Sequence, residues 1–446
     1  MLEAGGSAAD AAVAASLASC VAETVMTGLL GGGHGIYFDA DAGRAWNLDC
    51  FVAVPGLGGT WREPELEFLP VPFGEELVHY AVGPASCAVP GLPAGLGAIW
   101  ERFGRLPWPE LVEPALVLAR EGVAFPPAHA ACLAMLAPVM TMHEGAEIYS
   151  PGGRLLAAGD VLRQPGLERA LQLVAGEGAT SVYSGTLAEA LLGLLDERGG
   201  TITAADLEAY EPRWEESLET AYLGARFLTR GGLAGIAETL PGLPRLHGLS
   251  PRERVLALVD ALGSDDGGAG DTTNLVTVDA DGSACVLTTS LGLGSGDFLP
   301  GLDLHLNSML GEADLVRAPL RSGARMDSMM APSLVLDGDA LVLAVGAAGG
   351  TRLRTALATV VAGVLDEELD ARTAVERPRI HNAGAVVNAE PGVDEDALRA
   401  LEGLGRTVRR WPDRHHYFGG VSLVTPSGAA GDPRRSGSAR LLREES

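Results

Sequence analysis

The amino-acid sequence predicts an α+β fold, and three observations support this prediction. Two strand-like runs, residues 275–278 and 284–289, flank a turn cluster with an Asp-Gly pair at residues 281–282 and predict a β-hairpin. A further apolar strand is expected at 339–345, followed by a glycine-rich turn at 346–350 and a helix from Thr351 to about Leu365. Residues 92–103, 108–120 and 187–199 repeat apolar side chains at helical spacing, which predicts scaffold helices.

The composition indicates an acidic, soluble protein with a sizeable core. The chain has 446 residues, of which 47% are hydrophobic, and a formal net charge of -26. Nucleic acids and anionic membranes select basic surfaces, so neither is expected as a partner. The 5 cysteines and 9 histidines show no metal-site spacing, so no metal and no cofactor are expected. No charged and apolar leader precedes the first predicted helix, which favours a cytoplasmic protein, with a start that could be truncated.

The residues just before the predicted hairpin can support nucleophilic catalysis. Thr272 follows a flexible acidic glycine run, 263–271, so the bond between Asp271 and Thr272 is a candidate cleavage site. Cleavage would free the α-amine of Thr272, which could then act as the base for the threonine's own hydroxyl. Folding the hairpin about Asp281 pairs Thr272 with Ser290 and brings a second hydroxyl into reach. The alternative is a polar turn before a strand.

The glycine turn at residues 346–350 could support the same chemistry. It precedes a predicted helix, whose free N–H groups and positive dipole end would favour an oxyanion formed during acyl transfer. A tight strand-to-helix turn without catalytic role is the alternative.

Several motifs in the same order resemble the γ-glutamyltransferase (γ-glutamyltranspeptidase) family of N-terminal-nucleophile hydrolases, which are made as one chain and self-cleaved before a threonine. The matching segments are residues 3–15, 27–33, 48–49, 199–210, 272–273, 307, 328–332, 349–350 and 378–381. The resemblance implies an αββα sandwich of two stacked, mostly antiparallel sheets between helical layers. Residues 1–271 would form the large-subunit segment and residues 272–446 the small-subunit segment of one domain, so the cleaved subunits should stay associated, with a homo-oligomer possible.

The resemblance also implies roles for single residues. Thr272 matches the nucleophile, Ser290 the assisting hydroxyl, and Gly349 and Gly350 the backbone of the oxyanion hole. Three further residues fall where the family lines its donor pocket: Asn307, Ser328 and Met329.

The sequence departs from the family where the glutamyl head group would be recognised. Phe51 stands where typical members carry an arginine that binds the α-carboxylate, and a phenyl ring cannot make that contact. Gly292 replaces an asparagine, and Gly311 replaces the aspartate that binds the α-ammonium group, unless a one-residue gap places Glu312 there. Asn274 replaces a histidine. Three arginines could bind a donor carboxylate from another direction or be simply solvated: Arg321, Arg325 and Arg352.

Three functions remain open at this point, and the first two act on a small-molecule amide or peptide. The first is an autoprocessed γ-glutamyltransferase or hydrolase that acts on γ-glutamyl amides such as glutathione through an acyl-enzyme on Thr272. The second is an acylase of the same family with a non-glutamyl donor, for example a β-lactam side chain. The third is an unprocessed, inactive scaffold. Residues 427–446 are expected to form a partly ordered tail, in which residues 432–435 resemble the family's closing motif.

Overall fold

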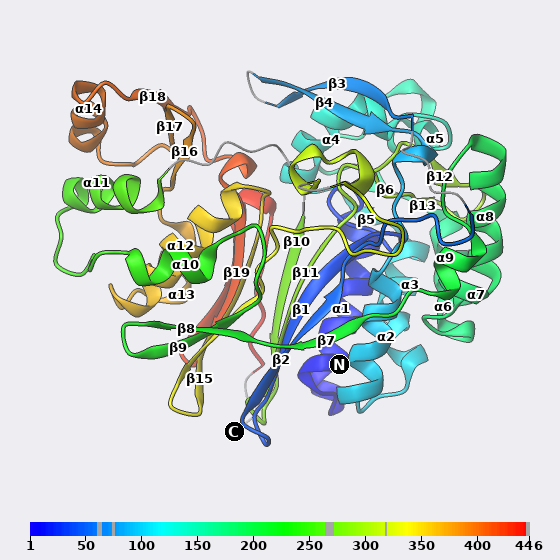
Figure 1. The fold of residues 1–446 in the computed structure, drawn as a ribbon, viewed down its shortest axis with the longest axis horizontal. Coiled ribbons are helices and arrows are strands. Elements are labelled where there is room, and N and C mark those ends of the chain that lie inside the picture. Colours follow the sequence, from blue (N-terminus) through cyan, green and yellow to red (C-terminus); the bar gives the residue numbers. More distant parts are fainter. Residues whose placement is uncertain (60–64, 74–75, 264–271, 317–318, 443–446) are drawn as a thin grey trace.

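Two antiparallel β-sheets face each other at the centre of the protein, and helices cover the outer side of each sheet (Figure 1). The computed structural model describes residues 1–59, 65–73, 76–263, 272–316 and 319–442. Helices and sheets therefore follow one another as four layers, α, β, β and α. This arrangement is the αββα sandwich that the family resemblance implied.

The first sheet brings together strands from distant parts of the chain. Its order is β10 (Thr273–Val278), β11 (Ala284–Ser290), β1 (Gly32–Asp39), β2 (Arg44–Cys50) and β7 (Arg213–Glu216). The β10–β11 pair is the hairpin predicted from the sequence. Side chains alternate along β1: Tyr37 packs against the helical layer, whereas Ile36 and Phe38 face the second sheet.

The second sheet contains the strand that leads to the predicted glycine turn. Its order is β20 (Gly428–Gly431), β19 (Gly420–Thr425), β15 (Ala340–Ala348), β14 (Ser333–Asp337), β9 (Ala225–Thr229) and β8 (Leu218–Tyr222). Apolar side chains of both sheets form a continuous core between them, including Val286 from β11 and Leu334 from β14. Burial of this interface fixes the position of one sheet on the other.

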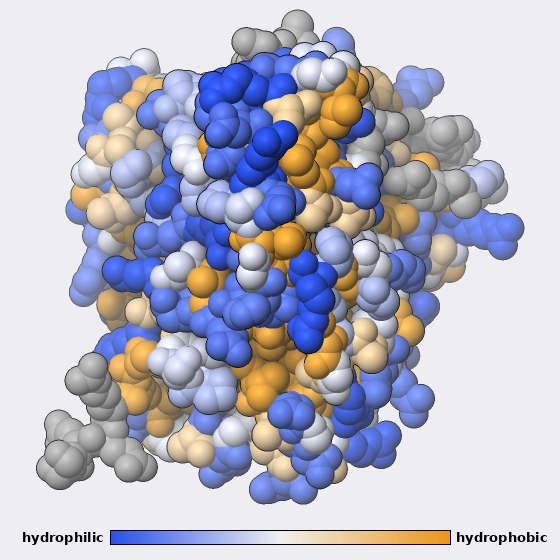
Figure 2. Space-filling view, turned by 90° about the vertical axis from the view of Figure 1, so that its left-hand side faces the viewer, coloured by the Kyte–Doolittle hydropathy of each residue, from blue (hydrophilic) through white to orange (hydrophobic). Residues whose placement is uncertain are grey.

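The helices form two separate outer layers, each with its own apolar core. The layer on the first sheet contains α1 (Ala8–Ala22), α2 (Leu92–Phe103), α3 (Trp108–Glu121), α6 (Pro165–Glu177), α7 (Ser181–Ser184), α8 (Thr186–Arg198) and α9 (Ala204–Glu208). The layer on the second sheet contains α10 (Ile236–Thr239), α11 (Pro251–Leu262), α12 (Arg352–Leu365), α13 (Ala371–Glu376) and α14 (Glu395–Gly403). Hydrophilic residues cover most of the face formed by this second layer, and hydrophobic ones gather in smaller patches (Figure 2).

Smaller elements extend the sandwich at its edges. A three-stranded sheet of β16 (Ile380–Ala383), β17 (Val386–Ala389) and β18 (Thr407–Arg410) lies beside α11 and α14. At the other end, a hairpin of β3 (Glu67–Phe73) and β4 (Glu76–Val82) projects near α4 (Pro127–Met140) and α5 (Gly145–Tyr149). Two short strand pairs lie in the same region: β5 (Val123–Ala124) with β6 (Val161–Leu162), and β12 (Phe298–Leu299) with β13 (Leu304–His305). No helix in the described parts of the chain is both long and apolar enough to cross a membrane.

Part of the segment expected to form a partly ordered tail packs into the fold. It forms β20 and a short 3-10 helix, η8 (Pro433–Arg435), and the side chains of Asp432, which caps this helix, and Arg434 are buried. Arg379 donates to Asp432 at 2.6 Å, and Arg434 donates to Asp432 at 3.1 Å and to Glu390 at 2.6 Å. A composition rich in glycine, serine and arginine is typical of loosely ordered segments. Here Arg434 forms ion pairs with buried carboxylates, and these pairs hold the segment in the core.

We predict that Asp432→Asn lowers the free energy of unfolding by about 3–5 kcal/mol, because it leaves buried arginines without their counter-charge. Burial alone would raise the pKa of the Asp432 carboxyl, but the charges of Arg379 and Arg434 hold that pKa below its ordinary value. The carboxylate therefore stabilises the fold above the ordinary carboxyl pKa, and this contribution is lost as the pH falls through the lower, folded-state pKa. Urea unfolding at neutral and acid pH should show a difference between wild type and variant that shrinks in acid.

A matched control is Glu219→Gln, which removes an ion pair to Arg226 on the surface. Exposed pairs contribute little, so its unfolding midpoint should stay close to that of the wild type. Equal losses in both variants would mean that burial of the Asp432 network is unimportant for stability.

Candidate active site

Thr272 and Ser290 lie opposite each other at one end of the β10–β11 hairpin. The ladder begins with the pair of Thr273 and Thr289, and continuing this register by one residue places Thr272 opposite Ser290, the pairing that the sequence predicted. Both side chains are almost buried, with 6% of Thr272 and 4% of Ser290 exposed. Both residues therefore line the same cavity in a place from which most bulk water is excluded.

Ser290 is held from two sides. Its hydroxyl accepts a hydrogen bond from the backbone N–H of Gly292 at 2.9 Å, and its backbone pairs with Gly32 of β1. The chain just before β1 approaches so closely that a Cβ atom on Gly31 would lie 2.2 Å from the Ser290 carbonyl oxygen. Glycine at this position thus allows the first sheet to close around Ser290.

The predicted glycine turn lies beside this pair of hydroxyls. Strand β15 continues to Ala348, so residues 346–348 of the predicted turn belong to the strand and pair with β19. Gly349 and Gly350 then adopt φ angles of 134° and 57° before α12 begins at Arg352. A Cβ on Gly349 would also approach the Cα of Gly419 to 2.8 Å. Backbone N–H groups at the start of a long helix favour negative charge. This geometry suits a developing oxyanion next to Thr272.

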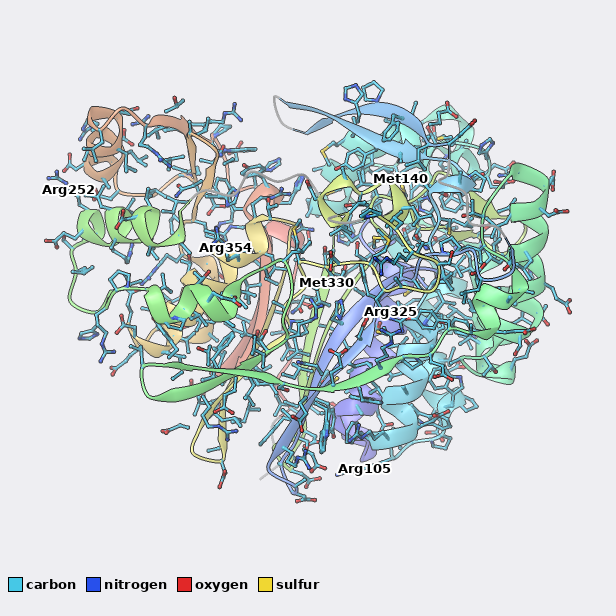
Figure 3. All side chains as sticks on the ribbon, viewed as in Figure 1. Arg105, Met140, Arg252, Arg325, Met330 and Arg354 are labelled. Atoms are coloured by element: carbon cyan, nitrogen blue, oxygen red, sulfur yellow. The ribbon has the colours of Figure 1, made fainter. Side chains whose placement is uncertain are left out.

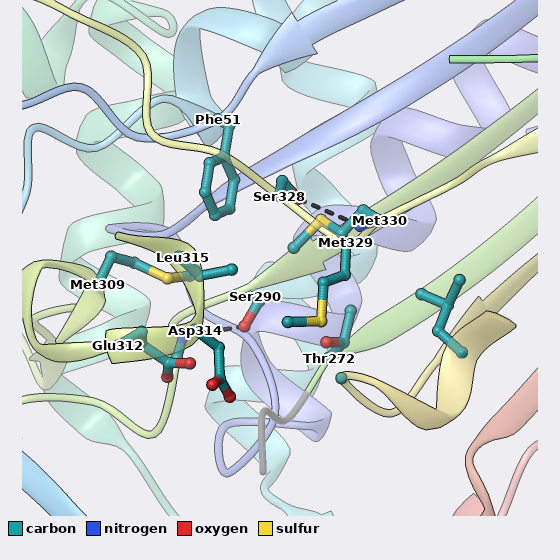
Figure 4. Close-up of a pocket in the computed structure, with 13 residues that line it drawn as sticks. Phe51, Thr272, Ser290, Met309, Glu312, Asp314, Leu315, Ser328, Met329 and Met330 are labelled. Carbon is teal, nitrogen blue, oxygen red and sulfur yellow. Dashed lines mark hydrogen bonds between the residues drawn. The ribbon is translucent and has the colours of Figure 1, made fainter. Parts of the chain in front are cut away.

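A cavity of about 440 Å³, including its open mouth, joins these groups (Figure 4). Most of its wall is apolar. The side chains of Thr272 and Ser290 lie near the middle of the view, with Glu312 and Asp314 on one side. The lining residues are Phe51, Thr272, Ser290, Gly292, Met309, Glu312, Asp314, Leu315, Ser328, Met329, Met330, Gly350 and Leu353.

The structure decides between Gly311 and Glu312 as the residue that faces the cavity. Gly311 belongs to the short helix η5 (Met309–Gly311), and a Cβ there would lie 2.0 Å from the Cβ of Ala81 in β4. No larger side chain fits at Gly311 without displacing the β3–β4 hairpin. Glu312, the alternative that a one-residue gap offered, lines the cavity instead. A Cβ on Gly292 would lie 2.8 Å from Glu312 Oε1, so the glycine leaves room for this carboxylate.

Phe51 lines the cavity as a fixed apolar wall. Only 1% of the residue is exposed, and its ring stacks on His34 with the ring centres 5.4 Å apart. Its N–H donates to Asp49 at 2.9 Å, and its carbonyl accepts from the Tyr210 hydroxyl at 2.6 Å. Both sides of the Phe51 peptide are thereby held in place.

Arginines lie behind this wall and bind the protein itself. Arg230 donates to the carbonyls of Ser328 and Met330, at 3.3 and 3.0 Å, and burial lowers the pKa of its guanidinium. Arg325 is labelled in Figure 3. It lies 3.4 Å from Asp49 and over the ring of Tyr210. Among the described residues that line the cavity, none is an arginine.

The other arginines and predicted donor-pocket residues occupy different surroundings. Arg321 is exposed, whereas Arg352 is buried against Tyr417. Ser328 and Met329 line the cavity, and the Ser328 hydroxyl accepts from Met330 N–H at 3.2 Å. Asn307 is fully buried, and a substrate could reach its amide only if existing hydrogen bonds were exchanged. These bonds join its amide to the backbone of residues 30, 88 and 309. Asp271 lies outside the described residues.

Three residues near Thr272 were not identified from the sequence as part of the site: Glu23, Thr27 and Arg435. Thr273 Oγ1 donates to the carboxylate of Glu23 at 2.5 Å, and the hydroxyls of Thr27 and Thr289 are 2.8 Å apart. Arg435 donates to the carbonyl of Thr272 at 3.3 Å. Two of the three lie in segments whose sequence already resembled family motifs, at residues 27–33 and 432–435, but nothing in the sequence places Glu23 against the hairpin.

The comparison with known proteins agrees with this geometry. The family model described as Gamma-glutamyltranspeptidase matches residues 1–243 and 258–442. The chain belongs to this family. It is thus an N-terminal-nucleophile amidohydrolase or acyltransferase by descent. Among the described residues, no group of three or more His, Cys, Asp or Glu side chains is placed to hold a metal ion.

Family members with different names are similar to this chain over most of its length. The Acylase ACY 1 proenzyme of Pseudomonas sp. (strain V22) is 27% identical and covers 95% of this chain and 86% of its own. The Glutathione hydrolase proenzyme of Bacillus subtilis (strain 168) is 24% identical, with coverages of 91% and 82%. The crystal structure of cephalosporin acylase from Bacillus halodurans superposes with a TM-score of 0.85 at 22% identity and covers 100% of this chain and 93% of its own, which shows the shared fold.

Asn274, which replaces a histidine of typical family members, joins the two sheets. Its Oδ1 accepts a hydrogen bond from the Thr288 hydroxyl at 2.8 Å, and its backbone carbonyl accepts from Ser422 in β19 at 3.2 Å. A Cβ on Gly346 of β15 would lie only 2.1 Å from Asn274 Oδ1. The asparagine thus packs directly on the strand that leads to the Gly349 turn.

We predict that Gly349→Ala destabilises the fold by about 1–3 kcal/mol, because a side chain at this φ angle is strained and meets Gly419. The matched control is Gly176→Ala in helix α6, where a Cβ meets no atom within 4 Å and should stabilise by about 0.5–1 kcal/mol. Urea unfolding of both variants measures the difference. Equal stability of the two variants would contradict the strained turn.

Proposed function

We propose that this protein is a self-processing amide acylase whose nucleophile is Thr272 and whose acyl donor carries a mainly apolar side chain. One observation carries the proposal: the cavity beside Thr272 and Ser290 is walled by apolar side chains. These are Phe51, Met309, Leu315, Met329, Met330 and Leu353. An apolar acyl group gains free energy from leaving water in such a cavity, whereas a donor carboxylate would find no arginine among the described lining residues.

Self-processing uses the same hydroxyl as turnover. The Thr272 Oγ attacks the carbonyl carbon of residue 271, so the peptide C–N bond breaks, an ester C–O bond forms, and the Thr272 α-amine is released with a proton from the hydroxyl. Water then hydrolyses the ester and leaves a carboxylate at the end of residues 1–271. Ser290, opposite Thr272, stabilises the attacking hydroxyl by hydrogen bonding.

Turnover repeats this chemistry on an external amide. The neutral α-amine takes the proton of Thr272 Oγ, which attacks the acyl carbonyl, and the N–H groups at Gly349 and Gly350 stabilise the resulting oxyanion. Collapse of the intermediate expels the amine product, which takes the proton from the α-ammonium. Attack by water on the acyl-enzyme gives the free acid, and attack by an amine gives a transferred acyl group.

The two segments remain together after cleavage. Strand β11 of residues 272–446 pairs with β1 of residues 1–271, and β14 pairs with β9 in the same way. Separation would break both sheets and expose the core between them. The mature enzyme is therefore one domain made from two chains.

Hydrolysis or transfer of a γ-glutamyl group is the second candidate, because Glu312 faces the cavity. Its carboxylate, with that of Asp314, could hold the α-ammonium group of a γ-glutamyl donor. The α-carboxylate of the same donor would then lie near Phe51 without a matching charge. Relatives carry both acylase and glutathione hydrolase names, so the donor must be decided by experiment.

The first prediction from this proposal concerns the nucleophile. Purified wild type should give two fragments that join between residues 271 and 272, and Thr272→Ala should remain one chain without amidase activity. Ser290→Ala should slow cleavage and turnover by roughly 10- to 1000-fold, because one positioned hydrogen-bonding group is lost. Intact-mass analysis and a chromogenic amide assay give both readouts. A cleaved and active Thr272→Ala would rule out this nucleophile, and an uncleaved, inactive wild type would favour an inert scaffold.

The second prediction concerns the donor. The wild type should hydrolyse a simple apolar acyl anilide with at least about 10-fold higher kcat/KM than a γ-glutamyl anilide, since burial of an apolar group adds roughly 1.5–3 kcal/mol. Phe51→Ala should lose most of this preference. Phe68→Ala, which changes a half-exposed ring on β3, is the matched control and should keep it. Preference for the γ-glutamyl anilide would establish the second candidate instead.

A further inference from the structure

A tight turn after helix α1 crosses the end of the hairpin that carries Thr272. Glu23 ends the helix, since its N–H donates to the carbonyl of Ser19 at 2.8 Å. The Glu23 carbonyl then accepts hydrogen bonds from the N–H groups of Met26 and Thr27, at 2.7 and 3.0 Å. The backbone of this turn, residues 23–27, is thereby fixed before its side chains reach the hairpin.

Two side chains of the turn hold the two strands next to the candidate catalytic pair. The Glu23 carboxylate accepts from Thr273 Oγ1 at 2.5 Å, and Thr27 Oγ1 lies 2.8 Å from Thr289 Oγ1. Thr273 and Thr289 are themselves directly paired across β10 and β11. The turn therefore forms hydrogen bonds to both members of the pair that adjoins Thr272 and Ser290.

Both contacts join residues 1–271 to residues 272–446, so they would persist after the chain is cut between them. A third contact comes from Arg435, which donates to the Thr272 carbonyl at 3.3 Å. The positive charge of Arg435 also lowers the pKa of the Glu23 carboxyl. The segment that becomes the new amino terminus is thus held on its side chain at Thr273 and on its backbone at Thr272.

We propose that Glu23 and Thr27 are positioning residues that keep Thr272 aligned with Ser290 during self-cleavage and afterwards during turnover. This inference rests on the proposed function of Thr272. Neither residue lines the cavity among the described residues, so neither is expected to contact the acyl group. Loss of a positioning contact should lower the rate of the chemical step and leave substrate binding nearly unchanged, because small displacements of reacting groups are costly.

The surroundings of Glu23 support a role beyond packing. Burial raises the pKa of the Glu23 carboxyl, while the hydrogen bond from Thr273 and the charge of Arg435 lower it only in part. A buried carboxylate of this kind opposes folding at neutral pH, so an apolar residue of similar size would be more stable here. A carboxylate at this position is better explained by alignment of the hairpin end.

The test compares three variants at the turn with a control on the same helix. Glu23→Ala should slow self-cleavage by about 10- to 100-fold, the loss expected for a hydrogen bond to a charged group. Glu23→Gln keeps an oxygen that can accept from Thr273 and should restore most of the rate. Thr27→Val should slow cleavage by about 3- to 10-fold, as for a neutral hydrogen bond. The control, Asp10→Ala, removes the capping carboxylate at the opposite end of α1 and should lower the melting temperature without slowing cleavage.

Cleavage is followed by intact mass against time, and kcat and KM are then measured with an acyl anilide on protein that has fully matured. The expected result for Glu23→Ala is a lower kcat with an unchanged KM. Wild-type rates in Glu23→Ala, or equal slowing in Asp10→Ala, would overturn the positioning role while leaving the nucleophile assignment intact. A wild type that is neither cleaved nor active would overturn both.

Discussion

The pairing of β10 with β11 is the constraint on which the rest of the site depends. An antiparallel register allows one partner for each residue, so the pair of Thr273 with Thr289 sets the position of Thr272 opposite Ser290. A shift by one residue would turn these side chains to the other face of the sheet. The surrounding structure therefore fixes this register from several directions, through β1 on one side and the 23–27 turn on the other.

The second sheet and the C-terminal segment converge on the same point. Strand β15 leads to the turn at Gly349, and Asn274 links that strand to the hairpin. The buried ion pairs of Arg379 with Asp432 and of Arg434 with Glu390 hold the short helix η8 near the C-terminal end in place. That anchoring positions Arg435 against the backbone of Thr272. Residues from both ends of the sequence thus contribute to one small region, which is why the fold must be complete before the site exists.

Much of this arrangement could be predicted from the sequence because it depends on local patterns. Two strand-like runs and a turn with an Asp-Gly pair predicted the hairpin and its register, and an apolar strand running into a glycine-rich segment before a helix predicted the turn at Gly349. The αββα layers followed from the family resemblance. The scaffold helices began and ended within a few residues of the predicted bounds.

Long-range contacts could not be predicted in this way. Nothing local to Glu23 indicates a partner 250 residues away. The composition of residues 427–446 suggested a partly ordered tail, because buried ion pairs leave no periodic pattern. The choice between Gly311 and Glu312 also required the structure, since it depends on how closely Ala81 of another strand approaches. In each case the deciding fact is the position of a residue from a distant segment.

The residues that changed relative to the family resemblance lie at the cavity wall, where we propose that the acyl donor is selected. In the proposed mechanism, hydroxyl and backbone groups set by the sheets would attack the amide and stabilise the developing charge. Phe51 forms an apolar wall, and Arg230 behind it is engaged with backbone carbonyls. Under the proposed function, exchange of these side chains would alter the donor without disturbing the sandwich.

The proposed function depends on the acyl-enzyme that the amino-terminal Thr272 would form. The most direct test mixes matured protein with a simple acyl anilide, quenches in acid during turnover, and measures the peptide that begins at Thr272 by mass spectrometry after proteolysis. If Thr272 forms the acyl-enzyme, this peptide should gain the mass of one acyl group, placed on the threonine by fragmentation. An acyl group on any other residue, or measurable turnover with no acylated peptide, would contradict it.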